Sequence, residues 1–133
     1  MNRKVFERYV QEYCMDLARK QNHHPHRQRH SCILTYNNSI ISTGVNVNLK
    51  NPFTEKFNFL KCLHAEASAI MRAISRHHSV LDRCELWVCR VGRESKLSHP
   101  CPMCMKIIHA FHIPIIHYTD HNGDWVMETL DWR

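Results

Sequence analysis

Two short motifs, 37 residues apart (101 minus 64), constrain the fold of this chain more than any other feature. The first reads His64-Ala65-Glu66 and the second reads Pro100-Cys101-Pro102-Met103-Cys104. One histidine and two cysteines can hold a zinc ion and leave its fourth tetrahedral position open. The chain must therefore fold so that two segments separated by a strand-like stretch meet at one metal ion.

The residues around each motif predict that both ligand sets lie at helix starts. Cys101 and Cys104 are three residues apart and share one helical face, and Pro102 is tolerated in a first turn. The N-terminal end of a helix also favours the thiolate form of cysteine. A second helix is predicted to begin at Ala65 and to end near His77. The metal should therefore lie where two helix N-termini converge.

Glu66 adds a group that can transfer protons to the predicted metal site. Water is a weak nucleophile, but on a catalytic zinc its pKa falls from about 15.7 towards about 7. A carboxylate beside the metal can remove the proton of that water and later protonate a leaving amine. Together these residues form the H-x-E and P-C-x-x-C signature of zinc-dependent nucleobase deaminases. The chain therefore resembles the cytidine/deoxycytidylate deaminase superfamily, and within it the small phage and viral zinc-dependent deaminases.

The resemblance implies a function and a set of site residues. It implies a zinc-dependent hydrolase with one Zn²⁺ per chain, bound by His64, Cys101 and Cys104. Zinc-bound hydroxide would attack C4 of cytosine in a free pyrimidine nucleotide or nucleoside, while Glu66 shuttles protons. Gly44-Val45-Asn46 is similar to the Gly-x-Asn of the superfamily, which assigns Asn46 to substrate binding unless it only caps a loop. The remaining residues assigned to the substrate are Ala65, through its backbone amide, and His99 and Pro100.

Several alternatives remain open on the sequence. Cys62 or His99 could close the zinc site as a fourth ligand, which would give a non-catalytic, zinc-stapled binding module. A deaminase fold without activity and deamination of a non-nucleotide heterocycle are further options. A nucleic-acid deaminase, acting on tRNA adenosine or single-stranded DNA cytosine, would stack a flipped base on aromatic side chains. The candidates for that role are Phe53, Phe57 and Phe59.

Composition narrows the class of protein. A length of 133 residues predicts a single domain, residues 1–133. The net charge of +6 favours anionic partners, either nucleotides or nucleic acid. No apolar run approaches the roughly 20 residues of a membrane span, and no signal peptide is recognised, so we expect no membrane partner and a cytoplasmic location. The resemblance implies a homo-oligomer of at least two chains.

Cysteine and basic residues need separate interpretation. The seven cysteines are an odd number without an export signal, which argues against a disulfide framework. Four of them, Cys14, Cys32, Cys84 and Cys89, are predicted to be buried free thiols. The basic cluster His23–His30 is interpreted as a solvated loop, with a phosphate-facing patch or a second metal site as the alternatives. The plausible phosphate contacts are Arg27, Arg29, Lys50, Lys56 and Arg93, and the sequence does not choose among them.

Hydrophobic periodicity predicts the order α-β-β-α-β-α-β-β. The resemblance implies the same class, an α/β fold built as a three-layer α/β/α sandwich with a mixed five-stranded sheet. Asn37-Asn38 and Asn122-Gly123 are predicted turns, and Asn48–Phe59 is a predicted loop near the site. The predicted helices cover 3–20, 65–77 and 102–112, and the predicted strands cover 32–36, 39–47, 85–91, 114–118 and 125–128.

Overall fold

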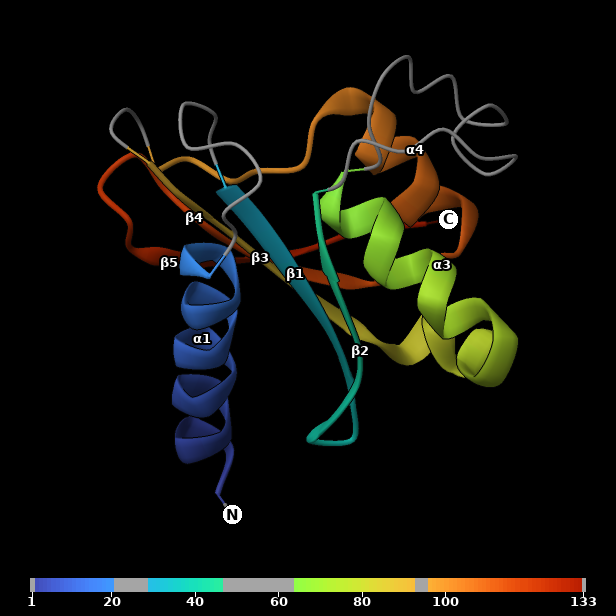
Figure 1. Ribbon diagram of the computed structural model, residues 1–133. Coiled ribbons are helices and arrows are strands. Elements are labelled where there is room, and N and C mark those ends of the chain that lie inside the picture. Colours follow the sequence, from blue (N-terminus) through green and yellow to red (C-terminus); the bar gives the residue numbers. More distant parts are fainter. Residues whose placement is uncertain (1, 21–28, 47–63, 93–95, 133) are drawn as a thin grey trace.

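The computed structural model describes residues 2–20, 29–46, 64–92 and 96–132. In these residues the predicted order of helices and strands is confirmed (Figure 1). The elements are α1 (Arg3–Arg19), β1 (Arg29–Tyr36), β2 (Ser39–Val45), α3 (Ala65–His77), the 3-10 helix η1 (His78–Arg83), β3 (Glu85–Val91), α4 (Pro102–Ala110), β4 (Ile115–Thr119) and β5 (Trp125–Thr129).

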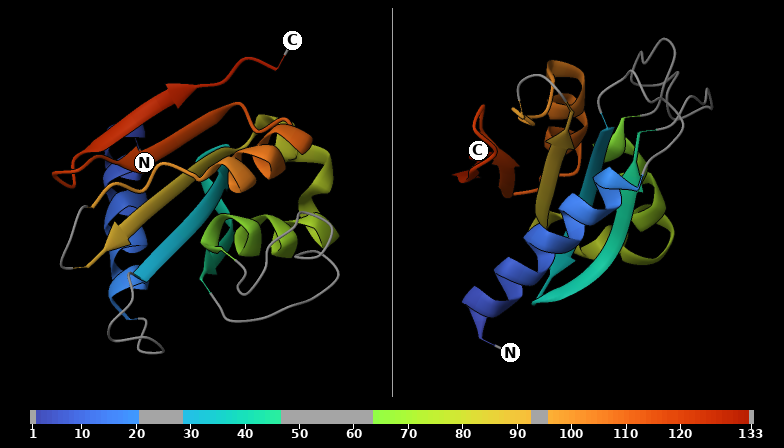
Figure 2. Two further views of the ribbon diagram at one scale, coloured as in Figure 1. Left: turned by 90° about the horizontal axis from the view of Figure 1, so that it is seen from above. Right: turned by 60° about the vertical axis from the view of Figure 1, so that its left-hand side comes forward.

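The strands form one mixed five-stranded sheet in the order β2-β1-β3-β4-β5. Strands β3 and β4 are parallel, and the other neighbouring pairs are antiparallel. Helix α1 covers one face of the sheet, and α3 and α4 cover the other (Figure 2). The predicted three-layer α/β/α sandwich is thus confirmed. No helix among the described residues combines the length and the apolar character that crossing a bilayer requires.

Alternation along the strands divides the core into two parts. On β1, Cys32 and Leu34 pack beneath α3 and α4, on what we call the zinc-side face. Ile33, between them, packs beneath α1, on what we call the α1 face. The same alternation on β3 sends Leu86 and Val88 to the zinc-side face and Trp87, Cys89 and Val91 to the α1 face. Because side chains alternate along a strand, these assignments also give the face of the sheet on which the adjacent residues of β1 and β3 lie.

Local sequence signals explain several boundaries. The Asn2 side chain accepts a hydrogen bond from the Val5 amide at 2.9 Å and so caps the start of α1. Asn37 and Asn38 have φ of 50° and 58°, which confirms the predicted hairpin turn, because asparagine tolerates the left-handed region better than most residues. The four cysteines predicted to be buried free thiols are free and buried.

The structure corrects three expectations. Arg29 and His30 belong to β1 and are not part of a solvated loop, whereas the rest of the His23–His30 cluster lies outside the described residues. Helix α4 ends at Ala110 instead of His112, because His112 takes a φ of 55° ahead of Pro114. The 3-10 helix η1 was not predicted at all. The predicted Asn48–Phe59 loop lies outside the described residues.

Candidate metal centre and active site

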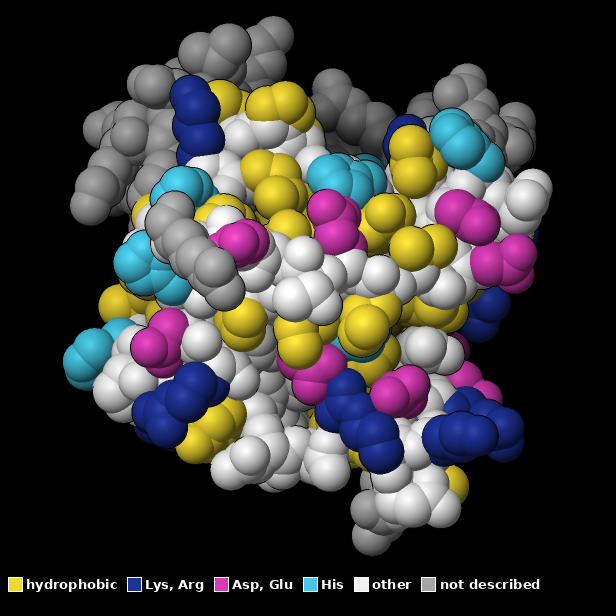
Figure 3. Space-filling model, turned by 180° about the vertical axis from the view of Figure 1, so that it is seen from behind, with side chains coloured by type: hydrophobic (Ala, Val, Ile, Leu, Met, Phe, Trp, Pro, Cys, Tyr) yellow, Lys and Arg dark blue, Asp and Glu magenta, His cyan; other side chains and the backbone are white. Residues whose placement is uncertain are grey.

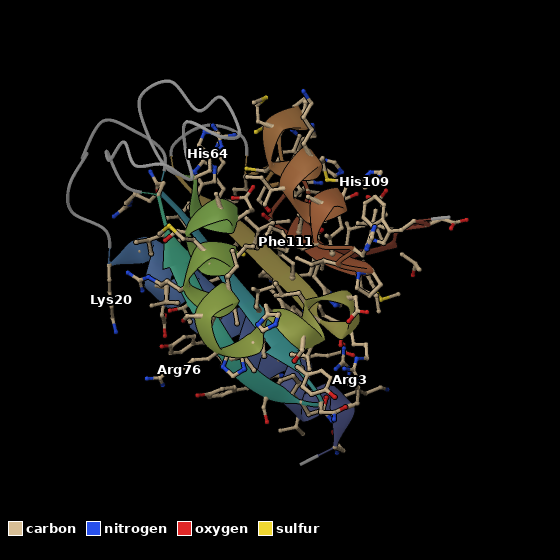
Figure 4. The ribbon with its side chains drawn as sticks, turned by 90° about the vertical axis from the view of Figure 1, so that its right-hand side faces the viewer. Arg3, Lys20, His64, Arg76, His109 and Phe111 are labelled. Atoms are coloured by element: carbon tan, nitrogen blue, oxygen red, sulfur yellow. The ribbon has the colours of Figure 1, made fainter. Side chains whose placement is uncertain are left out.

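The three expected zinc ligands lie at two helix starts, as predicted. His64 is the N-cap of α3, and Cys101 is the N-cap of α4. Both have nearly the same extended backbone, with φ/ψ of −69°/157° and −68°/166°. Cys104 follows in the first turn of α4. Figure 4 shows His64 at the N-terminal end of α3, next to α4.

The ligand atoms have the separations that zinc requires. The Nδ1 atom of His64 is 3.5 Å from the Cys101 Sγ and 3.3 Å from the Cys104 Sγ. All three ligand atoms lie within 4.8 Å of one another. Zinc bonds of about 2.3 Å to sulfur and 2.0–2.1 Å to nitrogen, at tetrahedral angles, separate N and S by about 3.5 Å. A zinc ion therefore fits between these side chains without rearrangement.

The hydrogen bond between the two thiols shifts their pKa values in opposite directions. A hydrogen bond with Cys104, helped by one with His64, lowers the pKa of Cys101 to about 3 against the opposing effect of burial. The bond with Cys101, together with burial, raises the pKa of Cys104 well above its usual value. Zinc binds cysteine as thiolate, so loading the site releases the remaining proton.

Glu66 occupies the first turn of α3 and lies inside the protein with an exposed fraction of 6%. Burial raises the pKa of its carboxyl, although its own backbone amide and His64 favour the charged form. Its side chain also shares a hydrogen bond with Cys104. A buried carboxyl beside the candidate metal ligands is placed to accept and to donate a proton.

A close backbone approach fixes the start of α3 against the sheet. A Cβ atom added to Gly44 on β2 would lie 2.4 Å from the Ala69 nitrogen and 2.5 Å from the Ala65 oxygen. Ser42 on the same strand donates a hydrogen bond to the Ala69 carbonyl at 2.7 Å. Only glycine allows β2 and α3 to pack this closely, so Gly44 helps to position the turn that carries His64 and Glu66.

The predicted substrate residues lie at the same end of the sheet. Asn46 follows β2, and its Oδ1 accepts a hydrogen bond from the His30 amide at 3.0 Å. This bond holds the Asn46 carboxamide in place and agrees with the loop-capping role. The role of Asn46 in substrate binding stays a prediction. Ala65 begins α3 and is fully buried, and Pro100 is buried next to Cys101.

His99 turns away from the metal ligands. Its side chain is 38% exposed, and its Nε2 lies 3.4 Å from the Glu128 Oε2. The ring packs edge-on against Tyr118, with centroids 4.8 Å apart. In the described part of the chain the metal cluster contains only His64, Cys101 and Cys104, so His99 does not close the site. Cys62 and the three candidate phenylalanines lie outside the described residues.

Two further residues near the site were missed by sequence reasoning. His30 on β1 and Arg90 on β3 are directly paired in the antiparallel register. Both occupy zinc-side positions by the alternation of their strands. By contrast, Arg29, which was a candidate phosphate contact, donates to the Arg19 carbonyl at the end of α1 at 2.9 Å. The two-residue alternation places Arg90 on the face of Leu86 and Val88, but its pairing with His30 depends on the register of β1 and β3.

Comparisons with known proteins agree with this site. The model of the cytidine and deoxycytidylate deaminase zinc-binding region matches residues 5–119. The dCMP deaminase of cyanophage S-TIM5 is similar over 90% of this chain and 85% of its own, with 23% identity and a TM-score of 0.59. The cytidine deaminase of Burkholderia pseudomallei is similar over 97% and 93% of the two chains, with 17% identity and a TM-score of 0.65.

The cyanophage enzyme in complex with dCMP and dUMP is also similar, with a TM-score of 0.57 at 21% identity over 90% of this chain and 83% of that one. No curated protein sequence matches the chain. At these identities the solved structures establish the fold, and the family model establishes the family. The chain therefore belongs to the cytidine and deoxycytidylate deaminase zinc-binding family, with His64, Cys101 and Cys104 as its candidate zinc site.

Proposed function

We propose that this protein is a zinc-dependent hydrolytic deaminase that converts cytosine to uracil in a free pyrimidine nucleotide or nucleoside. The observation that carries the proposal is the buried Glu66 carboxyl, with its raised pKa, beside a three-ligand zinc site. A purely structural zinc site has no use for such an acid. The similar cyanophage enzyme, which has been solved with dCMP and dUMP, supports this substrate class.

In the proposed reaction, the metal ligands and Glu66 have separate roles. His64, Cys101 and Cys104 would hold the zinc, which would supply a water nucleophile near neutral pH. Glu66 would take one proton from the attacking water as the new C4–O bond forms and deliver it to the ring nitrogen N3. Glu66 would then carry the second water proton to the exocyclic amine. The C4–N bond breaks, ammonia leaves, and the C4 carbonyl of uracil forms, so that one water is consumed for each ammonia released.

The other predicted residues would bind the base and the sugar. The backbone amide of Ala65, at the first position of α3, is proposed to donate to the base, and Asn46 is proposed to contact the base or the sugar. His99 and Pro100 border the cysteine motif and are proposed to line the entrance. Residues 1–133 are proposed to act together as one deaminase domain.

A deamination panel tests the proposal on zinc-loaded protein. The substrates are cytidine, deoxycytidine, CMP, dCMP, adenosine, single-stranded DNA and tRNA, and the product masses are measured. We expect conversion of at least one small cytosine compound, and Glu66→Ala should reduce it by about 100- to 10,000-fold without loss of zinc. Glu12→Ala on the exposed side of α1 is the control and should have no effect.

Two results would contradict the proposal. A mass change only in single-stranded DNA or tRNA would identify a nucleic-acid deaminase, an activity that the net charge of +6 would also suit. No turnover of any substrate by protein that retains zinc would identify a non-catalytic zinc module.

The protein is also proposed to form at least a dimer. Among the described hydrophobic residues, Val5, Tyr9 and Met127 are 50%, 49% and 60% exposed. Figure 3 shows yellow hydrophobic side chains interspersed with charged ones on the face of the molecule seen from behind. Sedimentation at working concentration should give at least twice the chain mass of 15.9 kDa, and a monomer alone would refute this part of the proposal.

A further inference from the structure

The cross-strand pair of His30 and Arg90 lies at the end of the sheet where the zinc ligands converge. The preceding zinc-side pair in the same register is Cys32 with Val88, and both of these belong to the core beneath α3 and α4. His30 and Arg90 are two residues further along their strands, so they face the same side. The pair therefore extends the core surface towards the metal centre.

Independent contacts place this pair beside the site. His30 donates its backbone amide to Asn46, one of the predicted substrate residues, at 3.0 Å. Burial together with Arg90 and then His64 lowers the pKa of the His30 imidazole to about 4, while Cys101 acts in the opposite direction. His30 is thus within electrostatic reach of His64, the N-cap of α3, and of Cys101, the N-cap of α4. Arg90 is paired with His30 on the neighbouring strand, so it is also close to the site.

Arg90 differs from the other arginine on these two strands. Arg29 directs its guanidinium to the end of α1, on the opposite side of the sheet. Arg90 is half-buried on the zinc-side face and donates from Nη1 to the Leu97 carbonyl at 3.3 Å. Leu97 belongs to the segment that leads into the cysteine motif. On the described parts of β1 and β3, Arg90 is therefore the arginine held towards the metal centre.

The chemistry of this arrangement favours a phosphate ester. A guanidinium is permanently charged, and its planar fork matches the oxygens of phosphate. Arg90 supplies this charge beside its cross-strand partner His30. Zinc with two thiolates has no net charge and would not oppose an incoming anion. A half-buried cation is also screened less than one in open solvent.

We propose that Arg90 is a specificity-determining residue that selects a pyrimidine carrying a phosphate, so that this site prefers a nucleoside monophosphate to a nucleoside. This inference rests on the proposed function, because it concerns the substrate of the same site. The phosphate could belong to a free nucleotide or to a polynucleotide. One guanidinium suits the single phosphate of a mononucleotide, which favours the free nucleotide.

Binding of reaction products tests Arg90 without requiring turnover. Calorimetry would compare dUMP, deoxyuridine and a short single-stranded DNA with one deoxyuridine on the zinc-loaded protein. The variant Arg90→Gln removes the charge and keeps an amide that can donate to Leu97. Arg83→Gln is the matched control, because Arg83 also donates to a backbone carbonyl at 3.3 Å but lies on η1.

We expect wild type and Arg83→Gln to bind dUMP about 10- to 100-fold more tightly than deoxyuridine, the range of one charged hydrogen-bonding group. Arg90→Gln should abolish this preference and leave the affinity for deoxyuridine unchanged. Equal binding of dUMP and deoxyuridine by wild type would overturn the inference. So would an equal loss for both ligands in Arg90→Gln, which would make Arg90 only a support for the Leu97 segment.

Two further measurements keep the test decisive. If Arg90→Gln does not fold, the Nε–H resonance of Arg90 in the wild type should shift on adding dUMP but not deoxyuridine, and no shift overturns the inference. If the DNA strand binds more tightly than dUMP and this binding depends on Arg90, the choice of a free nucleotide is overturned. Retained dUMP selectivity without any turnover would defeat only the proposed function, whereas turnover without phosphate preference would defeat only this inference.

Discussion

The two faces of the sheet are built for different tasks. On the zinc-side face, two helices start at the same end of the sheet and bring together His64, Glu66, Cys101 and Cys104. On the α1 face, one helix covers the core, and the polar groups bind one another. Buried polar residues alone therefore do not mark a site. The zinc-side groups gather metal-ligating side chains around one point, whereas those on the α1 face form a network that joins elements of the fold.

The network on the α1 face shows this internal pairing. The Glu85 carboxylate accepts hydrogen bonds from Arg3 at 2.6 Å and from His117 at 2.7 Å. The ring of His117 stacks flat on Trp87, with centroids 3.5 Å apart and planes 3° from parallel. These contacts join the start of α1 to β3 and β4. They lie at the beginning of β3, whereas Arg90 and the metal ligands lie at its other end.

Two fully buried thiols on opposite faces provide the strongest test of this contrast. Cys104→Ala on the zinc-side face should lower zinc affinity by more than about 100-fold and abolish deamination. The loss should exceed the roughly 10- to 100-fold seen when a residue that only hydrogen-bonds to a metal ligand is removed. Cys14→Ala, equally buried beneath α1, should cost about 1–2 kcal/mol of stability and retain both zinc and activity. Metal content and turnover are the measurements. Loss of zinc in Cys14→Ala would break the distinction between the faces.

A smaller effect is expected at the contact between β2 and α3. Gly44→Ala places a methyl group against the Ala65 and Ala69 backbone, which cannot move as a side chain can, and should cost about 3 kcal/mol or more. Gly123→Ala is the comparison, because its φ of 89° costs about 1–2 kcal/mol while its nearest neighbour is the flexible Lys96 side chain. Denaturant unfolding measures both. Equal costs would mean that β2 and α3 separate easily.

The mildest effect should come from Glu85→Gln, which weakens the α1 network. It should lower stability by about 1–3 kcal/mol at pH 7 and leave turnover unchanged. Burial raises the pKa of Glu85, but the bonds from His117 and Arg3 outweigh it and hold the pKa below the usual value. The carboxylate therefore stabilises the fold fully above the unfolded pKa of about 4.3, and this contribution is lost as pH falls through the folded value.

Urea unfolding of wild type and Glu85→Gln between pH 3 and pH 7 measures this difference. The two stabilities should converge at the acidic end. A constant difference across this range would show that the charge of Glu85 is not what joins α1 to the sheet. A loss of turnover matching the loss in Glu66→Ala would instead connect the α1 face to the active site.

Local sequence determined a large part of the structure. The metal ligands, the helix starts beside them and the Asn37-Asn38 turn were predictable, because each depends on side-chain chemistry within a few neighbouring residues. Hydrophobic periodicity likewise predicted the five strands and three α-helices of the described residues, with errors of a few residues at their ends. The 3-10 helix η1 escaped prediction because its six residues are too short to show a period.

Local sequence was thus enough to predict the candidate zinc ligands, the position of Glu66 beside them and the order of the described elements. Folding alone reveals that Gly44 packs against α3, that Glu85 joins Arg3 to His117, and that Arg90 lies on the zinc-side face whereas Arg29 reaches α1. Strand register explains the last of these differences. His30 and Arg90 are distant in the chain, and they become neighbours only because β1 and β3 pair antiparallel with both residues on one face.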